Sequence, residues 1–337
     1  MKTRTILHVT QCYTSGVARA IDTIVELSPS HEHHLLWSGE ELPHDGFASA
    51  TRLPRGGLSR TRAVRRTVRS TRADLVHAHS SFAGAYARAV GAGAPVVYQP
   101  HGYKVCDPHL AWVERQVYLQ AERFLGRRTA QVVVLSPEEE RIAAEVTPRS
   151  ARTFLPNVPG LSATTPRVRG GGERERLVVM AGRICDQKDP DFFADAAERI
   201  RRLDPTVTLL WLGQAVESPQ ADRLRRAGVE ITGWLAPPQM VDVLQRTGAY
   251  LHSAAYEGFP ISLLDALWCD APALVRPLPA FAGLDLPTAA TPHEAADLAL
   301  ALLDDDERRA AAHAAGAAVL AAMNESRQRE AIARIYG

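Results

Sequence analysis

Short apolar runs alternate along this chain with longer stretches of amphipathic character. In the first half, the runs rich in Val, Leu and Ile are TILHV, HHLLW, DLVHAH, PVVYQ, QVVVLS and RTFLP. The stretches at 17–27, 58–72, 82–90, 109–126 and 137–146 have the spacing of helices with one apolar face. Strands that alternate with helices predict a parallel sheet whose connections are helical crossovers.

The pattern is interrupted once and then begins again. Residues 161–176, LSATTPRVRGGGERER, are polar, charged and glycine-rich, which is the composition of a linker. New strand-like runs follow, namely LVVMAG, VTLLWLG, VEITGW, AYLHSA and APALV. We therefore expect an α/β chain of two doubly wound, Rossmann-like parallel-sheet domains, 1–160 and 177–322. Ligands of such sheets bind at the carboxyl ends of the strands, so we expect the domains to face each other across a cleft.

Residues 249–274, AYLHSAAYEGFPISLLDALWCDAPAL, place chemistry at one such strand end. Pro260 is predicted to be the first residue of a helix, whose opening N–H groups lack intrahelical partners and form an anion site. Glu257 is expected at the mouth of that site. Asp265 lies in an apolar helix and needs a partner or a ligand hydroxyl. The alternative is that both acids are hydrogen-bonded to neighbouring side chains.

The stretch LVVMAGRICDQKDPDFF, residues 177–193, predicts a second strand, loop and helix start. Asp189 suits a helix N-cap and the following proline the first helical position. Arg183 and Lys188 lie in the loop just before that cap. Two cations beside a helix N-terminus suit a diphosphate, although a solvated loop lysine remains the alternative for Lys188.

These segments together resemble a known family. YEGFPISLLDAL and AGRICDQKDP resemble the nucleotide-sugar half of the retaining glycosyltransferases of family 4, which have the GT-B fold. ILHVTQCYTSGVARAI resembles the family's first strand and glycine loop. DLVHAHSSFAGAYAR, VVYQPHGYKV and VVVLSPEEERIA resemble the subgroup that acts on bacterial surface polysaccharides.

The resemblance implies an activity and its partners. The chain is expected to be a metal-independent, retaining glycosyltransferase that moves a sugar from a nucleoside-diphosphate sugar, expected to be a UDP-sugar, to a hydroxyl acceptor. That acceptor is a lipid-linked polysaccharide precursor or a small natural product. The sugar nucleotide is a substrate, so no cofactor and no metal site are expected. The last helix, in 323–337, is expected to cross back to the first domain.

The resemblance also assigns roles to single residues. Arg183 and Lys188 stabilise the leaving diphosphate, Glu257 holds hydroxyls of the donor sugar, and Asp265 holds the ribose. His101, which follows the strand VVYQP, contacts the donor sugar or the reaction centre, and His79 is placed similarly. The residues expected to bind the donor are Gly16, Arg183, Lys188, Gly233, Trp234, Glu257, Gly258, Phe259, Pro260, Ile261 and Asp265.

Four departures from the family pattern keep two other functions open. The first loop has one glycine, Gly16, where the family has two, and Asp265 stands where the family has Glu. Asp270 replaces a small residue, and RPLPAFAGL, 276–284, replaces a glycine-rich loop. The alternatives are a nucleotide-sugar epimerase of the same fold and a catalytically silent protein that binds sugar nucleotides.

Charge and cysteine content indicate which binding partners and which cellular compartment to expect. A formal net charge of +1 over 337 residues gives no global field for nucleic acid. The four cysteines are scattered without metal spacing, which is typical of reduced thiols in a cytoplasmic protein. No apolar stretch reaches the roughly 20 residues of a membrane span.

The stretch 52–72 holds eight arginines and no acid. One interpretation is a solvated helix face. The other is attraction to anionic lipid or to a phosphate-bearing acceptor, with peripheral contact at the inner membrane face.

Overall fold

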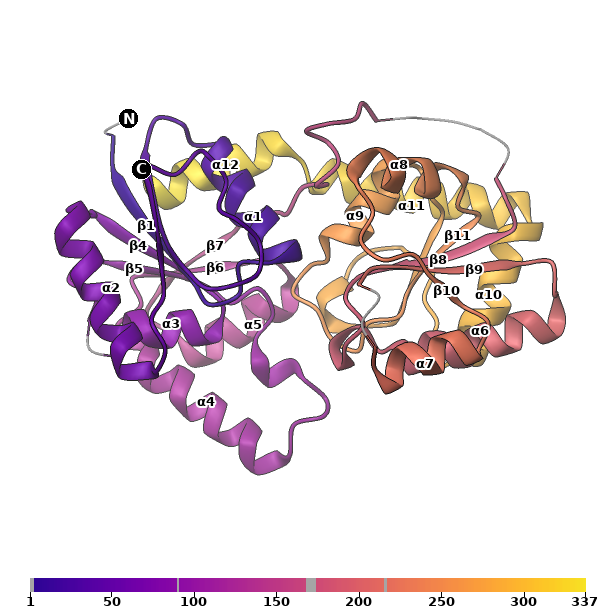
Figure 1. Ribbon diagram of the computed structural model, residues 1–337, viewed down its shortest axis with the longest axis horizontal. Helices are drawn as coiled ribbons and strands as arrows, with labels where there is room; N and C mark the ends of the chain where they lie inside the picture. Colours follow the sequence, from indigo (N-terminus) through magenta and orange to yellow (C-terminus); the bar gives the residue numbers. More distant parts are fainter. Residues whose placement is uncertain (1–2, 90, 168–173, 215–216) are drawn as a thin grey trace. The chain divides into compact units, whose positions relative to one another are not determined.

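The computed structural model describes residues 3–89, 91–167, 174–214 and 217–337. These residues form two compact units (Figure 1). The first comprises the chain up to Asn157 together with Glu325–Gly337, and the second comprises Val158–Asn324. The last thirteen residues therefore belong to the same unit as the N-terminus.

The first unit contains seven strands and six α-helices among its described residues. The strands are β1 (Thr5–Thr10), β2 (Glu32–Trp37), β3 (Ser49–Arg52), β4 (Leu75–His79), β5 (Val96–Gln99), β6 (Gln131–Val134) and β7 (Ala151–Phe154). The helices are α1 (Ser15–Glu26), α2 (Gly57–Thr71), α3 (Ser81–Arg88), α4 (Trp112–Gly126), α5 (Pro137–Val146) and α12 (Glu325–Tyr336). All neighbouring strands pair in parallel, in the order β3-β2-β1-β4-β5-β6-β7.

The two faces of this sheet are covered by different helices, because successive side chains of a strand point to opposite faces. Ile6 and Leu75 pack with Ile24 of α1 and with Ile332 of α12. On the opposite face, Leu7, Val76 and their neighbours pack with residues of α2 and α3. The helix α12, drawn in yellow beside the indigo α1 in Figure 1, thus completes the core of the first unit.

The second unit contains five strands and six α-helices among its described residues. The strands are β8 (Leu177–Ala181), β9 (Thr208–Leu212), β10 (Glu230–Ile231), β11 (Ala249–His252) and β12 (Ala273–Val275). The helices are α6 (Pro190–Leu203), α7 (Pro219–Arg226), α8 (Pro237–Arg246), α9 (Ile261–Trp268), α10 (Pro292–Asp304) and α11 (Asp306–Ala322). Its strands are also parallel, in the order β10-β9-β8-β11-β12.

The predicted fold class of two doubly wound parallel sheets is confirmed. The strand β3 was not predicted, because its four residues, SATR, are all exposed and show no apolar pattern. The segment expected to be a linker begins as part of the second unit. There the N–H of Leu161 donates to Asp265 at 2.9 Å, and the indole of Trp268 donates to the carbonyl of Thr165 at 2.9 Å. Residues 168–173 of that segment lie outside the described residues.

The packing of α12 predicts a measurable contribution to stability. Ile332→Ala should lower the free energy of unfolding of the first unit by about 2–5 kcal/mol, because it removes a buried aliphatic side chain from the core. Arg334→Ala, an exposed position on the same helix, is the matched control and should change the free energy by less than about 0.5 kcal/mol. Urea unfolding measures both values. Equal stability of the two variants would contradict this packing.

Candidate active site

Two loops meet at the carboxyl edge of the second unit's sheet. The strands β8 and β11 are neighbours and run in parallel, so the loops that follow them leave from the same edge. The N–H of Ala255 donates to the carbonyl of Gln187 at 2.9 Å, and the hydroxyl of Ser253 donates to the carbonyl of Lys188 at 2.7 Å. The two segments singled out in the sequence therefore lie side by side.

An ion pair joins these loops. The ammonium of Lys188 pairs with Oε1 of Glu257, and Nε2 of His252 lies 3.2 Å from the same oxygen. The second oxygen of Glu257 accepts a longer hydrogen bond, 3.4 Å, from the amide of Gln187. Glu257 is only 5% exposed, so it is a buried, paired acid, and its place at the mouth of an anion site stays a prediction.

The partners of Glu257 decide its charge. Burial by itself raises the pKa of Glu257, but the charge of Lys188 and the hydrogen bond with His252 outweigh burial and lower it to about 2. Burial lowers the pKa of His252, although Glu257 favours its charged form. At neutral pH Glu257 is therefore ionised. It is a strong hydrogen-bond acceptor and a weak proton acceptor.

The residues around Lys188 hold its side chain and backbone in place. A Cβ atom added to Gly182 would lie 3.2 Å from Cε of Lys188, so glycine leaves room for the lysine stem. The next residue, Asp189, caps α6 by accepting the N–H of Phe192 at 3.1 Å, and its other oxygen accepts from Arg276 at 2.6 Å. Arg276 also lies over the ring of Phe192 at 4.4 Å. A residue of the unusual RPLPAFAGL loop thus fixes the cap beside Lys188.

The start of α9 differs slightly from the prediction. Ile261 is the first helical residue, and Pro260 is the N-cap, with extended backbone. Gly258, Phe259, Pro260 and Ile261 are all buried. The ring of Phe259 packs edge-on against Phe281 of the RPLPAFAGL loop, 5.9 Å between centroids. This segment can therefore offer a ligand its first-turn N–H groups rather than its side chains.

Asp265 lies deeper than a typical ligand group. It is 3% exposed, and its Oδ1 accepts the N–H of Leu161 at 2.9 Å. The structure therefore gives this carboxylate a partner in the backbone of its own unit. Its assignment to the ribose stays a prediction.

Two further residues predicted to bind the donor have side chains that are accessible to a ligand. Arg183, two residues after β8, is half-buried and makes no hydrogen bond or ion pair with any residue that the structure describes. Trp234 is 53% exposed and follows Gly233, whose φ is +76°, at the carboxyl end of β10. An uncommitted guanidinium and an open aromatic face suit an anionic group and a planar base respectively.

His101 and Gly16 belong to the first unit and lie at the carboxyl ends of β5 and β1. His101 has φ +53°, and the next N–H, of Gly102, donates to Oε1 of Glu139 at 2.6 Å. A non-glycine residue in this conformation costs about 1–3 kcal/mol and is typical of functional sites. A Cβ atom added to Gly16 would meet nothing within 4 Å, so no contact described in this unit requires a glycine there.

Sequence reasoning missed four residues that build the site. His252 and Ser253 stand in the run AYLHSA, which indicated only a buried strand, and Gln187 looked like an ordinary loop residue. Arg276 was visible only as part of a departure from the family pattern. A histidine that ends an otherwise apolar strand, five residues before an acid, was the available signal for His252.

The departure at Asp270 also has a structural reason. Its φ is +62°, directly after α9, which is a conformation that favours glycine and that Asp tolerates. Arg174 donates to its carbonyl oxygen at 2.9 Å and to its carboxylate at 3.3 Å. Asp270 is therefore a helix-terminating residue held by an ion pair, and neither contact involves Lys188 or Glu257.

Comparison with family models decides the classification. The glycosyl transferase 4-like domain matches residues 13–158, and the model described as glycosyl transferases group 1 matches residues 175–305. The chain belongs to the family 4-like glycosyltransferases. The resemblance inferred from its motifs is confirmed.

Known relatives of this glycosyltransferase agree. The UDP-Gal:alpha-D-GlcNAc-diphosphoundecaprenol alpha-1,3-galactosyltransferase of Escherichia coli is 26% identical over 225 residues, which cover 60% of this chain and 57% of that enzyme's length. Sucrose-phosphate synthase of Thermosynechococcus elongatus has a TM-score of 0.79 at 14% identity, covering 99% of this chain and 98% of the other. Anabaena Alr3699/HepE in complex with UDP-glucose has a TM-score of 0.74 at 16% identity, covering 99% of both. At these identities the two structures establish the fold alone.

The low pKa of Glu257 predicts how acid affects stability. A carboxyl whose pKa falls from 4.5 to about 2 on folding contributes stability that is complete above pH 4.5 and is lost as the pH falls towards 2. Such a shift corresponds to roughly 3 kcal/mol for this buried pair. The difference in unfolding free energy between wild type and Glu257→Gln should therefore shrink from pH 6 to pH 3. Urea titrations at both pH values measure it, and a constant difference would contradict the ionised pair.

Proposed function

We propose that this chain transfers a sugar from a UDP-sugar to a hydroxyl acceptor, with retention of configuration and without a metal ion. The observation that carries the proposal is the ion pair of Lys188 with Glu257 at the junction of two loops, the first of which also carries Arg183, a cation without a partner among the described residues. This edge offers a diphosphate two cations and the first turn of α9, and it offers a sugar an ionised acceptor. The UDP-sugar named for the galactosyltransferase, and the UDP-glucose bound by HepE, support UDP as the nucleotide.

The residues of the edge divide the chemistry between them. The bond from the anomeric carbon to the diphosphate breaks, and charge grows on the leaving phosphate oxygen. Arg183 and Lys188 stabilise that charge. The acceptor oxygen bonds to the same face of the anomeric carbon, and its proton passes to the leaving diphosphate. Glu257, with a pKa near 2, is a poor base and serves instead to hold donor hydroxyls.

The nucleoside lies, in this proposal, along the same edge. Trp234 stacks on the base, and Asp265 accepts a hydrogen bond from the ribose. The two departures that the structure explains, at Asp270 and Arg276, support an intact site over a silent one. A silent protein would bind a UDP-sugar without consuming it, and an epimerase would release a changed UDP-sugar with no acceptor present.

A donor assay separates these functions. Purified protein is screened by thermal shift against UDP-glucose, UDP-galactose and UDP-N-acetylglucosamine, since a bound ligand raises apparent stability. The stabilising donor is then incubated with and without an extract of acceptor lipids, in the presence of a chelator. Release of UDP that depends on acceptor and persists with chelator supports the proposal. Acceptor-independent conversion, or no release, would replace it with the epimerase or the silent protein.

The phosphate contacts predict the effect of removing one cation. Arg183→Ala should lower kcat/KM for the donor about tenfold to a hundredfold, because it removes a charge-assisted contact worth about 1.5–3 kcal/mol. The fold should be unaffected, since Arg183 has no partner among the described residues. Arg202→Ala, an exposed position near the end of α6, is the matched control. Wild-type kinetics for Arg183→Ala would remove it from the site.

The acceptor is proposed to be lipid-linked and to be reached at an anionic membrane surface. No helix in the described part of the chain is long and apolar enough to cross a bilayer. The helix α2 exposes Arg62, Arg65, Arg66 and Arg69, which line one surface pocket. The helix α4 exposes an apolar stripe at helical spacing, Val113, Val117 and Phe124, with Trp112 at its start. Both helices contact α3. Cations and exposed apolar side chains together are typical of a peripheral membrane face.

The exposed arginines of α2 predict salt-dependent binding to vesicles. Wild type should sediment with vesicles that contain anionic lipid, and binding should weaken with salt because exposed charges are screened within roughly 8 Å at physiological ionic strength. Changing the four α2 arginines to Gln should abolish binding yet spare cleavage of a soluble donor. Vesicles of neutral lipid are the control. Equal sedimentation of both proteins would return these arginines to a solvated face and favour a small soluble acceptor.

A further inference from the structure

A row of four histidines crosses one face of the first unit's sheet, the face covered by α1 and α12. His8 lies on β1, His33 on β2, and His79 at the end of β4, while His101 follows β5. His8 and His79 are fully buried, and His33 is 3% exposed. Elsewhere this face is built from residues such as Ile6. Buried imidazoles in such surroundings are costly unless their nitrogens are hydrogen-bonded.

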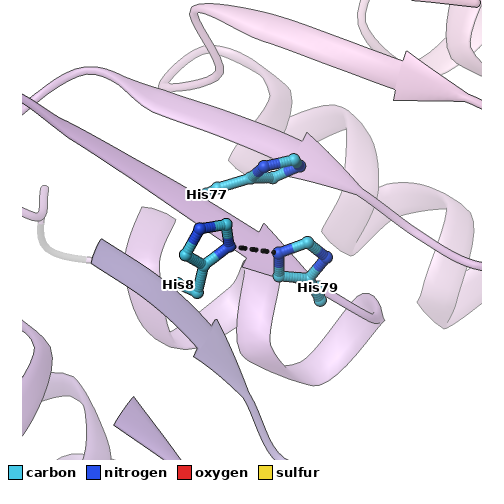
Figure 2. Close-up of side chains that lie close together, drawn as sticks. All are labelled: His8, His77 and His79. Atoms are coloured by element: carbon cyan, nitrogen blue, oxygen red, sulfur yellow. Dashed lines mark hydrogen bonds between the residues drawn. The ribbon is translucent and has the colours of Figure 1, made fainter. Parts of the chain in front are cut away.

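The imidazoles bond to one another in an unbroken row. Nε2 of His101 lies 3.0 Å from Nδ1 of His79, and Nε2 of His79 lies 3.0 Å from Nδ1 of His8. Figure 2 shows the link between His79 and His8. Nε2 of His8 lies 3.0 Å from Nδ1 of His33. The row ends where Nε2 of His33 lies 3.1 Å from the backbone carbonyl of Ser28.

The inner end of the row sets the direction of every bond. A carbonyl oxygen only accepts. The hydroxyl of Ser28 donates to the carbonyl of Ile24 at 2.5 Å, so towards His33, at 3.2 Å, it also accepts. Nε2 of His33 must therefore carry the hydrogen. A neutral imidazole has one N–H, so Nδ1 of His33 accepts from His8.

Because each neutral imidazole has one N–H, the same assignment follows for each histidine from His8 outward to His101. Nδ1 of His8 accepts from His79, Nδ1 of His79 accepts from His101, and Nδ1 of His101 is left without a hydrogen. The rings are neutral because burial lowers the pKa of His8 and His79 well below its ordinary value, and that of His101 to about 4. Burial lowers the pKa of His33 as well.

We propose that this row locks His101 in the tautomer with hydrogen on Nε2, so that Nδ1 accepts a hydrogen bond from a hydroxyl of the substrate. His8, His33 and His79 are positioning residues that act through His101. Nδ1 of His101 has no hydrogen-bond partner among the described residues, and it lies where ligands of parallel sheets bind. The Gly102–Glu139 hydrogen bond holds the loop in this conformation. The substrate part of this inference rests on the proposed function, and the tautomer part does not.

Two other functions for these histidines fit the geometry less well. His8, His77 and His79 bring nitrogens within 4.8 Å of one another, as a metal site would. However, the rings of His77 and His79 are stacked at 4.1 Å, so their in-plane lone pairs run side by side, and the nitrogens of His8 and His79 already face each other. A proton path through the row is also disfavoured, because its inner end is a carbonyl that takes no proton.

Nitrogen-15 NMR of the histidine side chains tests the tautomers directly, since it distinguishes protonated from bare ring nitrogens. In the wild-type chain near pH 7.5, all four rings should show hydrogen on Nε2 alone. His33→Leu removes the fixed end, so His101 should show averaged tautomers, and donor turnover should fall about threefold to tenfold. His33→Gln should restore both, because its amide donates to Ser28 and its carbonyl accepts from His8.

The matched control is His77→Leu, which removes a buried imidazole of the same face whose hydrogen bond goes to Tyr336 and not to the row. It should leave the tautomer of His101 unchanged. Hydrogen on Nδ1 of wild-type His101, a single tautomer that survives His33→Leu, or one equivalent of Zn²⁺ shifting His8 and His79 together would each overturn the lock. A locked tautomer in a protein that turns over no donor would refute the proposed function and leave the lock standing.

Discussion

The proposed donor site depends on one interaction, the ion pair between Lys188 and Glu257. Neither charge is stable alone in so buried a place, because removing one partner of a buried pair costs about 3–5 kcal/mol. The pair therefore fixes where the loops after β8 and β11 meet. Gln187 contacts the carboxylate of Glu257, Ser253 contacts the backbone of Lys188, and the Asp189–Arg276 bond fixes the residue next to Lys188.

At the carboxyl edge of the first unit, buried polar partners also fix the loops, but there the partners include neutral histidines. Ser15, Ser80 and His101 follow their strands with positive φ. Such backbone persists only where the surroundings fix it, and Glu139 and the histidine row supply that support around His101. In both units, groups at the sheet edge are held by buried polar partners beneath them.

The architecture could be predicted from the sequence because the spacing of apolar residues within each strand and helix is a local signal. A parallel strand such as β8 is a continuous apolar run, and the exposed β3 was missed because it has no such run. The motifs also predicted which loops carry Lys188 and Glu257. They did not predict that these residues pair, nor that Arg276 binds Asp189, because the two contacts join residues 69 and 87 positions apart. They did not predict the role of His252 either, because this residue ends a strand that is otherwise apolar. The histidine row could not be predicted either, because it depends on which residues of neighbouring strands lie opposite each other.

The most direct test compares two affinities by calorimetry, those for UDP and for the stabilising UDP-sugar, in wild type and in Glu257→Gln. If Lys188 binds the diphosphate and Glu257 the sugar, the variant should keep its affinity for UDP within about threefold and lose the additional affinity that the sugar confers, since one charged hydrogen-bond acceptor is replaced by a neutral one. An equal loss of affinity for both ligands would show that the pair only supports the loops, and would contradict the division of roles on which the proposed mechanism rests.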